Sequence, residues 1–427
     1  MYSEDYPEAV GSSTPVVEFV SESELWEEQA NWDDQDKSLY LCVGDYYGRR
    51  GKVLYVVYRI NLKALLFSED LEFETVFEVP NNDNIGNCAG FGMGLSMIFL
   101  GGGFRAKYSK EFVVPEPCTG ILAYRIRKIF EDGGLAHFLD GKVRPLIWEV
   151  EGNLFALARN PPPRIDTGFP ASEWRNCFEM YDRAQRRWVG LPDPPSYAEY
   201  PVAAVDESGG VGGGGIDEEE ELVGCDDGAL RRHCYYSSFS YAILGSQLFV
   251  SNPHYHEYSY KCNLPSKREN WPVEWKVSSF QFQGVTLGVQ TAQGFVVFSY
   301  DVNFHPPEYV VKLEDNPYLN IKVQLLINGY DEPVLSQSLM MPQELDEVQD
   351  SQFVHLGGQK VCFLYSRMRD SKLLVTAITF GFQLEQRNSG FKVKAKFYPT
   401  RNWEFQNKAG SKAKVWGTEQ MVGAVVG

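Results

Sequence analysis

Two histidines, His254 and His256, come nearest in this chain to the spacing of a metal site. Side chains two positions apart in an extended chain point to the same side, so both imidazoles could bind one metal ion. No third ligand is evident from the sequence, and a stable site needs one. Because Asn252-Pro253 precedes the pair, we interpret it as part of a polar loop between strands. No catalytic, cofactor-binding or metal-binding residue is assigned, and no cofactor is expected.

Three lysines near the C-terminal end, Lys392, Lys394 and Lys396, alternate with apolar residues. In a strand this spacing places three ammonium groups on one face. One interpretation is a phosphate-binding or RNA-binding face, but such faces also use arginine and exposed aromatic residues. Lysines on an edge strand also prevent unwanted pairing with other chains. We therefore predict a solvated outer edge strand.

Sequence motifs of common enzymes are missing. The chain has no Gly-x4-Gly-Lys-Ser/Thr loop, no His-Glu-x-x-His and no Gly-x-Ser-x-Gly. The alternating glycines Gly90, Gly92 and Gly94 lack the dinucleotide-binding spacing, and we interpret them as turn glycines. Carboxylates are too frequent to nominate a glycosidase pair. The sequence therefore predicts a protein that is not an enzyme.

The acidic charge is concentrated in two segments. The formal net charge is −17, from 57 acidic and 40 basic residues. Residues 1–36 hold eleven acidic side chains and residues 206–227 hold nine, and neither segment has a basic residue. The remaining 37 acidic and 40 basic residues make the body nearly neutral. Both segments would repel phosphates, so no nucleic-acid partner is expected.

Each acidic segment has its own expected structure. Residues 1–37 are predicted to be a largely disordered tail, or to add a closing strand at residues 16–20. A short helix is expected from Ser21, with its end near Asn31. The second segment, within a Gly-rich insert at residues 204–232, has too few apolar residues to order itself and is predicted to be a flexible loop. Docking of a basic partner on this insert is the alternative.

Cysteine usage and hydropathy bear on the compartment. The eight cysteines have no Cys-x-x-Cys pair, and the chain has no Asn-x-Ser/Thr acceptor. The first 36 residues show no secretory signal. The uncharged stretch at residues 85–104 contains seven glycines and is better explained by strands than by a membrane span. We expect reduced cysteines, a cytoplasmic or nuclear location and no membrane partner.

Two recurring patterns predict strands. In the first, a turn glycine leads into a short apolar run of the kind found in strands that are buried on both faces. In the second, an apolar strand ends in an aromatic residue. The second pattern occurs six times, ending at Tyr58, Tyr124, Tyr181, Tyr260, Tyr300 and Phe380. The uneven intervals favour a propeller, whose loops absorb them, over a solenoid.

The most complete copy runs from Trp148 to Trp188. It reads as a strand, a tight turn at Gly152-Asn153, a second strand, a third strand ending at Tyr181-Asp182, and a tryptophan packed under the next turn. This unit resembles one blade of a kelch-type β-propeller, and Gly101-Gly102 matches the diglycine of kelch repeats. Within that group it is most similar to the plant kelch and F-box-associated propellers.

The resemblance implies an all-β fold, a kelch-like β-propeller of six four-stranded blades with room for a seventh. The propeller is expected over residues 38–405, followed by a C-terminal tail at residues 406–427. The expected blades cover residues 38–80, 86–140, 143–203, 235–278, 280–345 and 350–405.

The same resemblance sets the functional expectation. Galactose oxidase shares the kelch architecture and binds copper, but its ligand set has no match here, so the likeness implies the fold only. The acidic leader also lacks the Leu-Pro start of an F-box. We therefore expect a monomeric, intracellular interaction platform of the kelch-repeat type that binds a protein partner through loops on one face. The alternatives are a substrate-recognition subunit for ubiquitin ligation, and a small-ligand-binding, sugar-binding or enzymatic propeller that uses the central channel.

Overall fold

The computed structural model describes twenty ranges of the chain. The acidic insert, His254 and His256 lie outside them. The described ranges are residues 18–32, 37–47, 52–68, 72–80, 85–86, 89–108, 113–125, 128–131, 137–159, 176–198, 239–251, 259–265, 273–300, 318–327, 331–342, 348, 350–369, 372–388, 390–405 and 420–427.

The described residues form 28 strands and three short helices, which confirms the all-β class. Most strands belong to six four-stranded antiparallel units, numbered here in chain order, and a parallel strand pair joins units 2 and 3 into one eight-stranded sheet. Unit 1 consists of β28 (Gln420–Val426), β2 (Ser38–Tyr47), β3 (Lys52–Asn61) and β4 (Phe73–Pro80). Unit 2 consists of β5 (Gly90–Gly94), β6 (Met97–Gly101), β9 (Ile121–Arg125) and β10 (Lys128–Glu131). Unit 3 consists of β11 (Leu146–Val150), β12 (Asn153–Leu157), β13 (Phe178–Asp182) and β14 (Arg187–Leu191).

Units 4 to 6 repeat this arrangement. Unit 4 consists of β15 (Ser240–Leu244), β16 (Gln247–Ser251), β17 (Ser259–Asn263) and β18 (Trp275–Ser278). Unit 5 consists of β19 (Val285–Gln290), β20 (Gly294–Tyr300), β21 (Tyr318–Ile327) and β22 (Leu335–Pro342). Unit 6 consists of β23 (Asp350–Gly357), β24 (Lys360–Arg369), β25 (Lys372–Arg387) and β26 (Gly390–Phe397).

The remaining elements attach to these units. A hairpin of β7 (Phe104–Tyr108) and β8 (Val113–Pro117) leaves unit 2, and β27 (Arg401–Phe405) pairs with β25. The helices are α1 (Glu22–Ala30), α2 (Leu62–Phe67) and α3 (Pro195–Ala198).

Tight turns connect the first two strands of several units. Glu151 and Gly152, with φ of 49° and 79°, join β11 to β12, and Leu95 and Ser96, with φ of 54° and 57°, join β5 to β6. Positive φ at both central residues is typical of the type I′ turn, whose twist matches that of the two strands in a tight hairpin. The predicted strand–turn–strand pattern is therefore present, with the Gly152 turn one residue earlier than the sequence indicated.

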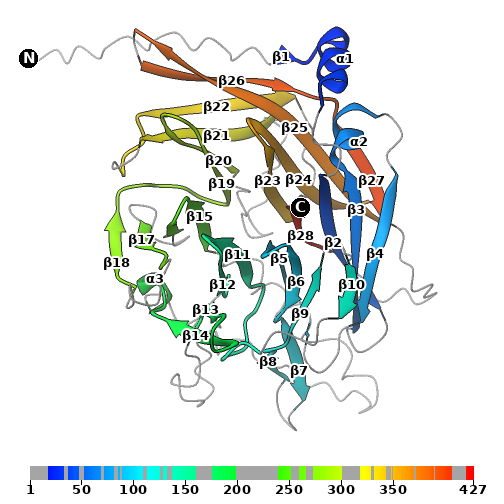
Figure 1. Ribbon diagram of the computed structural model, residues 1–427, viewed down its shortest axis with the longest axis vertical. Coiled ribbons are helices and arrows are strands. Elements are labelled where there is room, and N and C mark those ends of the chain that lie inside the picture. Colours follow the sequence, from blue (N-terminus) through cyan, green and yellow to red (C-terminus); the bar gives the residue numbers. More distant parts are fainter. Residues whose placement is uncertain are drawn as a thin grey trace, which may run out of the picture.

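The six units follow one another around a common centre (Figure 1), where β28, β5, β11, β15, β19 and β23 lie. Six hydrophobic cores fill the spaces between successive units, including the space between unit 6 and unit 1. Each core buries side chains from both neighbours, so the units are held together by side-chain packing more than by hydrogen bonds between sheets.

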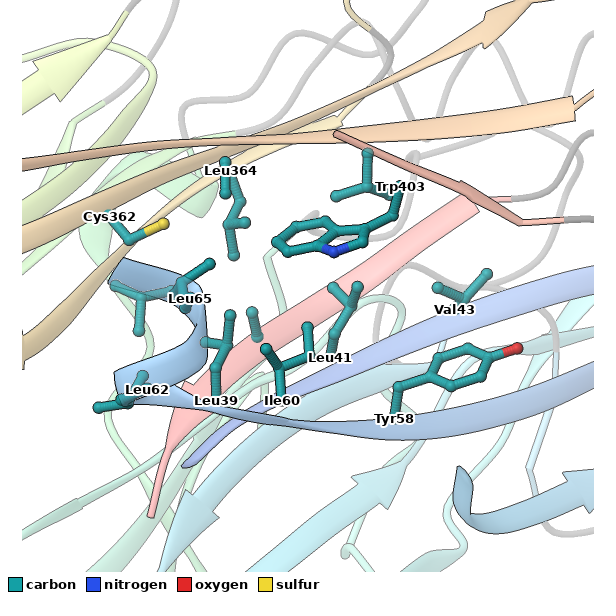
Figure 2. Close-up of a cluster of buried hydrophobic side chains, with 14 of the residues drawn as sticks. Leu39, Leu41, Val43, Tyr58, Ile60, Leu62, Leu65, Cys362, Leu364 and Trp403 are labelled. Atoms are coloured by element: carbon teal, nitrogen blue, oxygen red, sulfur yellow. The ribbon is translucent and has the colours of Figure 1, made fainter. Parts of the chain in front are cut away.

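The junction between units 6 and 1 closes the ring. In Figure 2, Leu39 and Leu41 of unit 1 face Leu364 and Trp403 of unit 6, and all four are buried. β28, from the C-terminal end of the chain, pairs with β2 near the N-terminal end. The Gln352 side chain donates to the Ala424 carbonyl at 2.8 Å and accepts from the Ala424 N–H at 2.9 Å. The expected C-terminal tail at residues 406–427 thus ends in a strand of the first sheet.

The N-terminal segment also joins the last unit. β1 (Glu18–Phe19) pairs in parallel with β26. Ser21 caps α1 through a capping box with Glu24, and Asn31 ends the helix, so the helix predicted between these residues is confirmed. The predicted closing strand is therefore partly present at the N-terminus, but the strand that completes unit 1 comes from the other end of the chain.

The glycines of β5 require a correction. Gly90, Gly92 and Gly94 lie within a strand and not in turns. A Cβ atom on Gly90 would lie 2.0 Å from the Pro145 carbonyl oxygen, and one on Gly92 would lie 2.0 Å from that of Ile147. These glycines let β5 and β11 approach closely in parallel at the centre of the ring.

Trp188 is buried in the core between units 2 and 3. Its partner across the β13–β14 pair is Tyr181, with ring centroids 5.4 Å apart. The ring of Phe138, in the connection that leads into unit 3, lies 4.9 Å from that of Trp188. Trp188 is therefore a core residue, as predicted.

Candidate functional site

Five residues gather where the central strands begin. Arg144 precedes β11, Asp350 starts β23, and Tyr241 lies near the start of β15. Arg159 follows the end of β12, which runs antiparallel to β11, and Ser366 lies in β24 opposite Asp350. We call this group the ring mouth; its members are Arg144, Arg159, Tyr241, Asp350 and Ser366.

An ion pair between units that are not neighbours in the ring organises the mouth. The Arg144 guanidinium lies 2.5 Å from an oxygen of Asp350, and the two side chains are 14% and 8% exposed. Arg144 leads into unit 3, whereas Asp350 belongs to unit 6. The ion pair therefore connects opposite sides of the ring, 206 residues apart in sequence.

The backbone of Arg144 is in an unfavourable conformation. Its φ is 48°, in the left-handed region that non-glycine residues seldom adopt. The next residue, Pro145, makes this less favourable because a residue before proline prefers an extended backbone. Conformations of this kind cost on the order of 1–3 kcal/mol and cluster at functional sites.

Two tyrosines hold the backbone around Arg159. Tyr241 donates to the Arg159 carbonyl, and its hydroxyl lies 2.8 Å from that of Tyr197, which donates to the Ala158 carbonyl. Burial raises the pKa of Tyr197 and of Tyr241, so both stay neutral donors. Burial lowers the pKa of Arg159, and the nearby positive charge of Arg144 lowers it further. The negative charge of Asp350 offsets part of this decrease. Arg159 stays charged because guanidinium pKa values start far above neutrality.

Three buried atoms of the mouth have no hydrogen-bond partner within the described part of the chain. They are Nε of Arg159, Oδ2 of Asp350 and Oγ of Ser366. Asp350 and Ser366 are direct partners in the β23–β24 register. Buried polar atoms in native proteins are nearly always satisfied, so orphans that cluster mark a site for a water or a ligand.

The polar groups of the mouth determine which ligand could fit it. Among the described residues, two guanidinium groups and one carboxylate leave a net positive charge, with one acceptor without a partner at Asp350 and a hydroxyl at Ser366. A ligand that fits must bring a negative acceptor and a donor. The buried thiols are poor nucleophiles, because burial raises the pKa of Cys177, Cys262 and Cys362 to about 12.

A second polar cluster joins the connection between units 2 and 3 to β13. Lys142 and Glu179 form an ion pair with both side chains fully buried. Lys142 also donates to the Asn176 carbonyl at 2.5 Å, and Glu179 accepts from the backbone N–H groups of Leu139 and Asp140 at 3.0 and 3.2 Å. Burial raises the pKa of Glu179, although Lys142 and the two N–H groups lower it in part. This cluster fastens the connection between units 2 and 3.

A cavity of about 240 Å³ lies elsewhere, on unit 6. An ion pair of 2.9 Å joins Lys372 and Glu404 in its lining, and Arg367 adds a second cation. Its lining consists of Arg367, Lys372, Leu374, Asn402 and Glu404.

The residues singled out by sequence fare differently. Within the described ranges, no group of His, Cys, Asp and Glu side chains could hold a metal ion. Lys392, Lys394 and Lys396 are exposed on β26, as predicted, but this strand is not a free edge at Lys396, where β1 pairs with it. The last two form ion pairs, Lys394 with Glu385 at 2.7 Å and Lys396 with Glu24 at 2.5 Å.

None of the helices found in the described ranges has the length and apolar character that a membrane crossing requires.

Sequence reasoning missed the ring mouth. Arg144 and Arg159 flank the first hairpin of the best-recognised unit, and that position was the available signal. In a ring of such units the ends of the first hairpin face the centre. The pairing of Arg144 with Asp350 depends on ring closure, which no local pattern contains.

Comparison with known proteins identifies no family for the chain. No family model and no curated protein matches the chain. Among solved structures, YjhT is 7% identical, with a TM-score of 0.34, over 83% of this chain and 97% of that chain. A structure of Hsv2 from Kluyveromyces lactis is 6% identical, with a TM-score of 0.35, over 85% of this chain and 99% of that chain. Similarity this low defines neither a family nor a function.

Proposed function

We propose that this chain is a six-bladed β-propeller of the kelch-like group that acts as a non-enzymatic platform for a protein partner. The partner binds on the face where the central strands begin, at the ring mouth. The propeller assignment is supported by six four-stranded units with a hydrophobic core between each successive pair. Completion of unit 1 by β28 supports it further, because ring proteins need such a closure.

The observation that carries the binding proposal is the cluster of orphan atoms at the mouth. Nε of Arg159, Oδ2 of Asp350 and Oγ of Ser366 come from units 3 and 6 and are buried without partners among the described residues. Maintaining them costs free energy in the unbound protein. A partner that supplies the missing hydrogen bonds would recover that free energy on binding.

The non-enzymatic and intracellular parts of the proposal have separate support. The titratable groups at the mouth are arginines, a carboxylate and a tyrosine whose pKa is raised, which suits binding better than nucleophilic attack. Five cysteines in the described ranges are free thiols, and four of these are buried. Free thiols are typical of a reducing compartment, so we place the protein in the cytoplasm or nucleus, as a monomer.

A small-ligand or enzymatic role for the central channel is the second candidate. The observation that favours it is that Arg144, Arg159 and Asp350 bring three titratable groups together at the channel entrance. A role in ubiquitin ligation, through a separate adaptor, is a special case of the leading proposal and depends on which partner binds.

Affinity purification with matched variants tests the proposal. The bait is the full chain as wild type, as Arg159→Met and as Arg183→Met. Arg183 is exposed in the β13–β14 turn of the same unit, at the opposite end of the strands, and serves as the control. We expect one set of proteins to be captured by the wild type and the control and lost with Arg159→Met. Equal capture by all three baits would contradict binding at the mouth, and ligase scaffold components in the lost set would favour ubiquitin ligation.

A further inference from the structure

We infer that the ring mouth takes the carboxylate of an acidic side chain, presented by an extended peptide segment whose backbone N–H reaches Asp350. This inference rests on the proposed function and adds the chemistry of the group that is recognised.

The charge balance at the mouth calls for an anion. Arg144 is already paired with Asp350, at 2.5 Å. Arg159 is a second cation nearby, and the charges of Arg144 and Asp350 both act on it. Counting only the described residues of the mouth, one positive charge is therefore left over. A guanidinium offers donors in a planar fork that matches the two oxygens of a carboxylate.

The orphan acceptor narrows the class of anion. Oδ2 of Asp350 is buried and has no donor among the described residues, and the opposite residue, Ser366, has a buried hydroxyl that can donate or accept. A phosphate group would bring nearly two negative charges close to Asp350 and no donor at neutral pH. A peptide brings both required groups, since each residue carries a backbone N–H. An acidic residue in a peptide thus matches the mouth better than a free or peptide-borne phosphate.

The site is built before the ligand arrives. Tyr241 and Tyr197 fix the backbone at Arg159 and Ala158 by hydrogen bonds, and the cross-ring ion pair fixes Arg144. Side chains that are already ordered lose less entropy on binding. A short linear segment could therefore bind with measurable affinity.

Selection from a displayed library of random linear peptides tests the inference, with the full-length wild-type chain as target. We expect the enriched peptides to share Asp or Glu at one position. A synthetic peptide from the enriched set should bind Arg159→Met and Asp350→Asn about 10- to 100-fold more weakly than the wild type, the range for a charge-assisted hydrogen bond. Binding to Arg183→Met should be unchanged.

A double-mutant cycle gives the sharpest form of the test. Replacing the acidic residue of the peptide by Gln should weaken binding to the wild type about as much as Arg159→Met does. The combination of both changes should cost little more than either alone. Melting curves accompany each variant, and Arg159→Lys, which keeps the charge but loses the fork, replaces Arg159→Met if the latter does not fold.

Each contrary outcome has a distinct meaning. Enriched peptides without an acidic residue that still depend on Arg159 would overturn the inference and leave the proposed function standing. Tighter binding of a phosphoserine peptide than of its Glu counterpart would also overturn it. Enrichment that none of the mouth variants affects, or no enrichment at all, would count against both.

Discussion

Lys142 and Arg144 stand two residues apart on the connection from unit 2 to unit 3, yet they serve different ion pairs. Lys142 pairs with Glu179 inside the protein, where both side chains are fully buried. Arg144 pairs with Asp350 across the ring, where both side chains are slightly exposed. The backbone at Arg144 is left-handed, and it stands just before the start of β11.

The two pairs differ most in how well their polar atoms are satisfied. Around Lys142 and Glu179, the carboxylate accepts from two backbone N–H groups as well as from the ammonium. Around Arg144 and Asp350, three buried atoms have no partner among the described residues. A satisfied buried pair fixes a structure, whereas an incompletely satisfied pair at the entrance of a ring is available to a ligand.

The largest expected effect comes from breaking the buried pair. Lys142→Met leaves the Glu179 carboxylate buried without its cation, and we expect a loss of about 3–5 kcal/mol in the free energy of unfolding. Denaturant titration measures this loss. The double variant Lys142→Met/Glu179→Leu should recover a large part of it. A single variant within about 1 kcal/mol of the wild type would show that the pair is not structural.

Trp188→Ala should have a comparable effect, through packing instead of charge. Trp188 fills the core between units 2 and 3, against Phe138 on the same connection that carries Lys142. Removing a buried tryptophan leaves a cavity and should cost about 3–5 kcal/mol. The readout is thermal melting. Unchanged melting with a loss of partner binding would make Trp188 a contact residue and contradict its place in the core.

A smaller effect is expected from Asp193, near the Lys142 cluster. Burial raises the pKa of this carboxyl group to about 6 from an ordinary 3.8, although the hydrogen bond from the Phe178 N–H opposes the rise. Between these pH values the folded chain holds a proton that the unfolded chain has lost. The contribution of Asp193 to stability should therefore fall as pH rises from about 4 to 6, by about 3 kcal/mol at most, and then level off.

The Asp193→Asn variant isolates this contribution. The amide keeps an oxygen that accepts from Phe178 but does not titrate. Denaturant midpoints at pH 4, 5, 6 and 7 should show that the stability of the wild type, relative to that of the variant, falls as pH rises. The same pH dependence in both would place the Asp193 pKa near its ordinary value.

The smallest effect is expected from deletion of residues 206–227, the acidic segment that follows unit 3. Nine carboxylates, no basic residue and many glycines argue against a stable core contact. Removing them should leave the melting temperature nearly unchanged, because loop length costs little closure entropy. Limited proteolysis of the wild type should cut there first. Unfolding on deletion would show that the segment is structural, and selective loss of one partner would make it the docking site.

Local patterns in the sequence predicted much of the fold. The expected limits 38–80 and 350–405 enclose β2 to β4 and β23 to β27, since turn glycines and aromatic strand ends lie within each unit. Contacts between distant segments were not predictable in this way. The glycines of β5 were misread because their reason is the approach of β11, some fifty residues later. The ring mouth was missed because Asp350 reaches Arg144 only after the ring closes.

One measurement tests most directly whether the two ion pairs have different roles: denaturant unfolding of Arg159→Met beside Lys142→Met. The Nε of Arg159 is buried without an acceptor among the described residues, so its removal should leave the free energy of unfolding within about 1 kcal/mol of the wild type, or raise it. Lys142→Met should lose about 3–5 kcal/mol in the same experiment. Equal losses in the two variants would contradict the account, because the ring mouth would then be as structural as the buried pair.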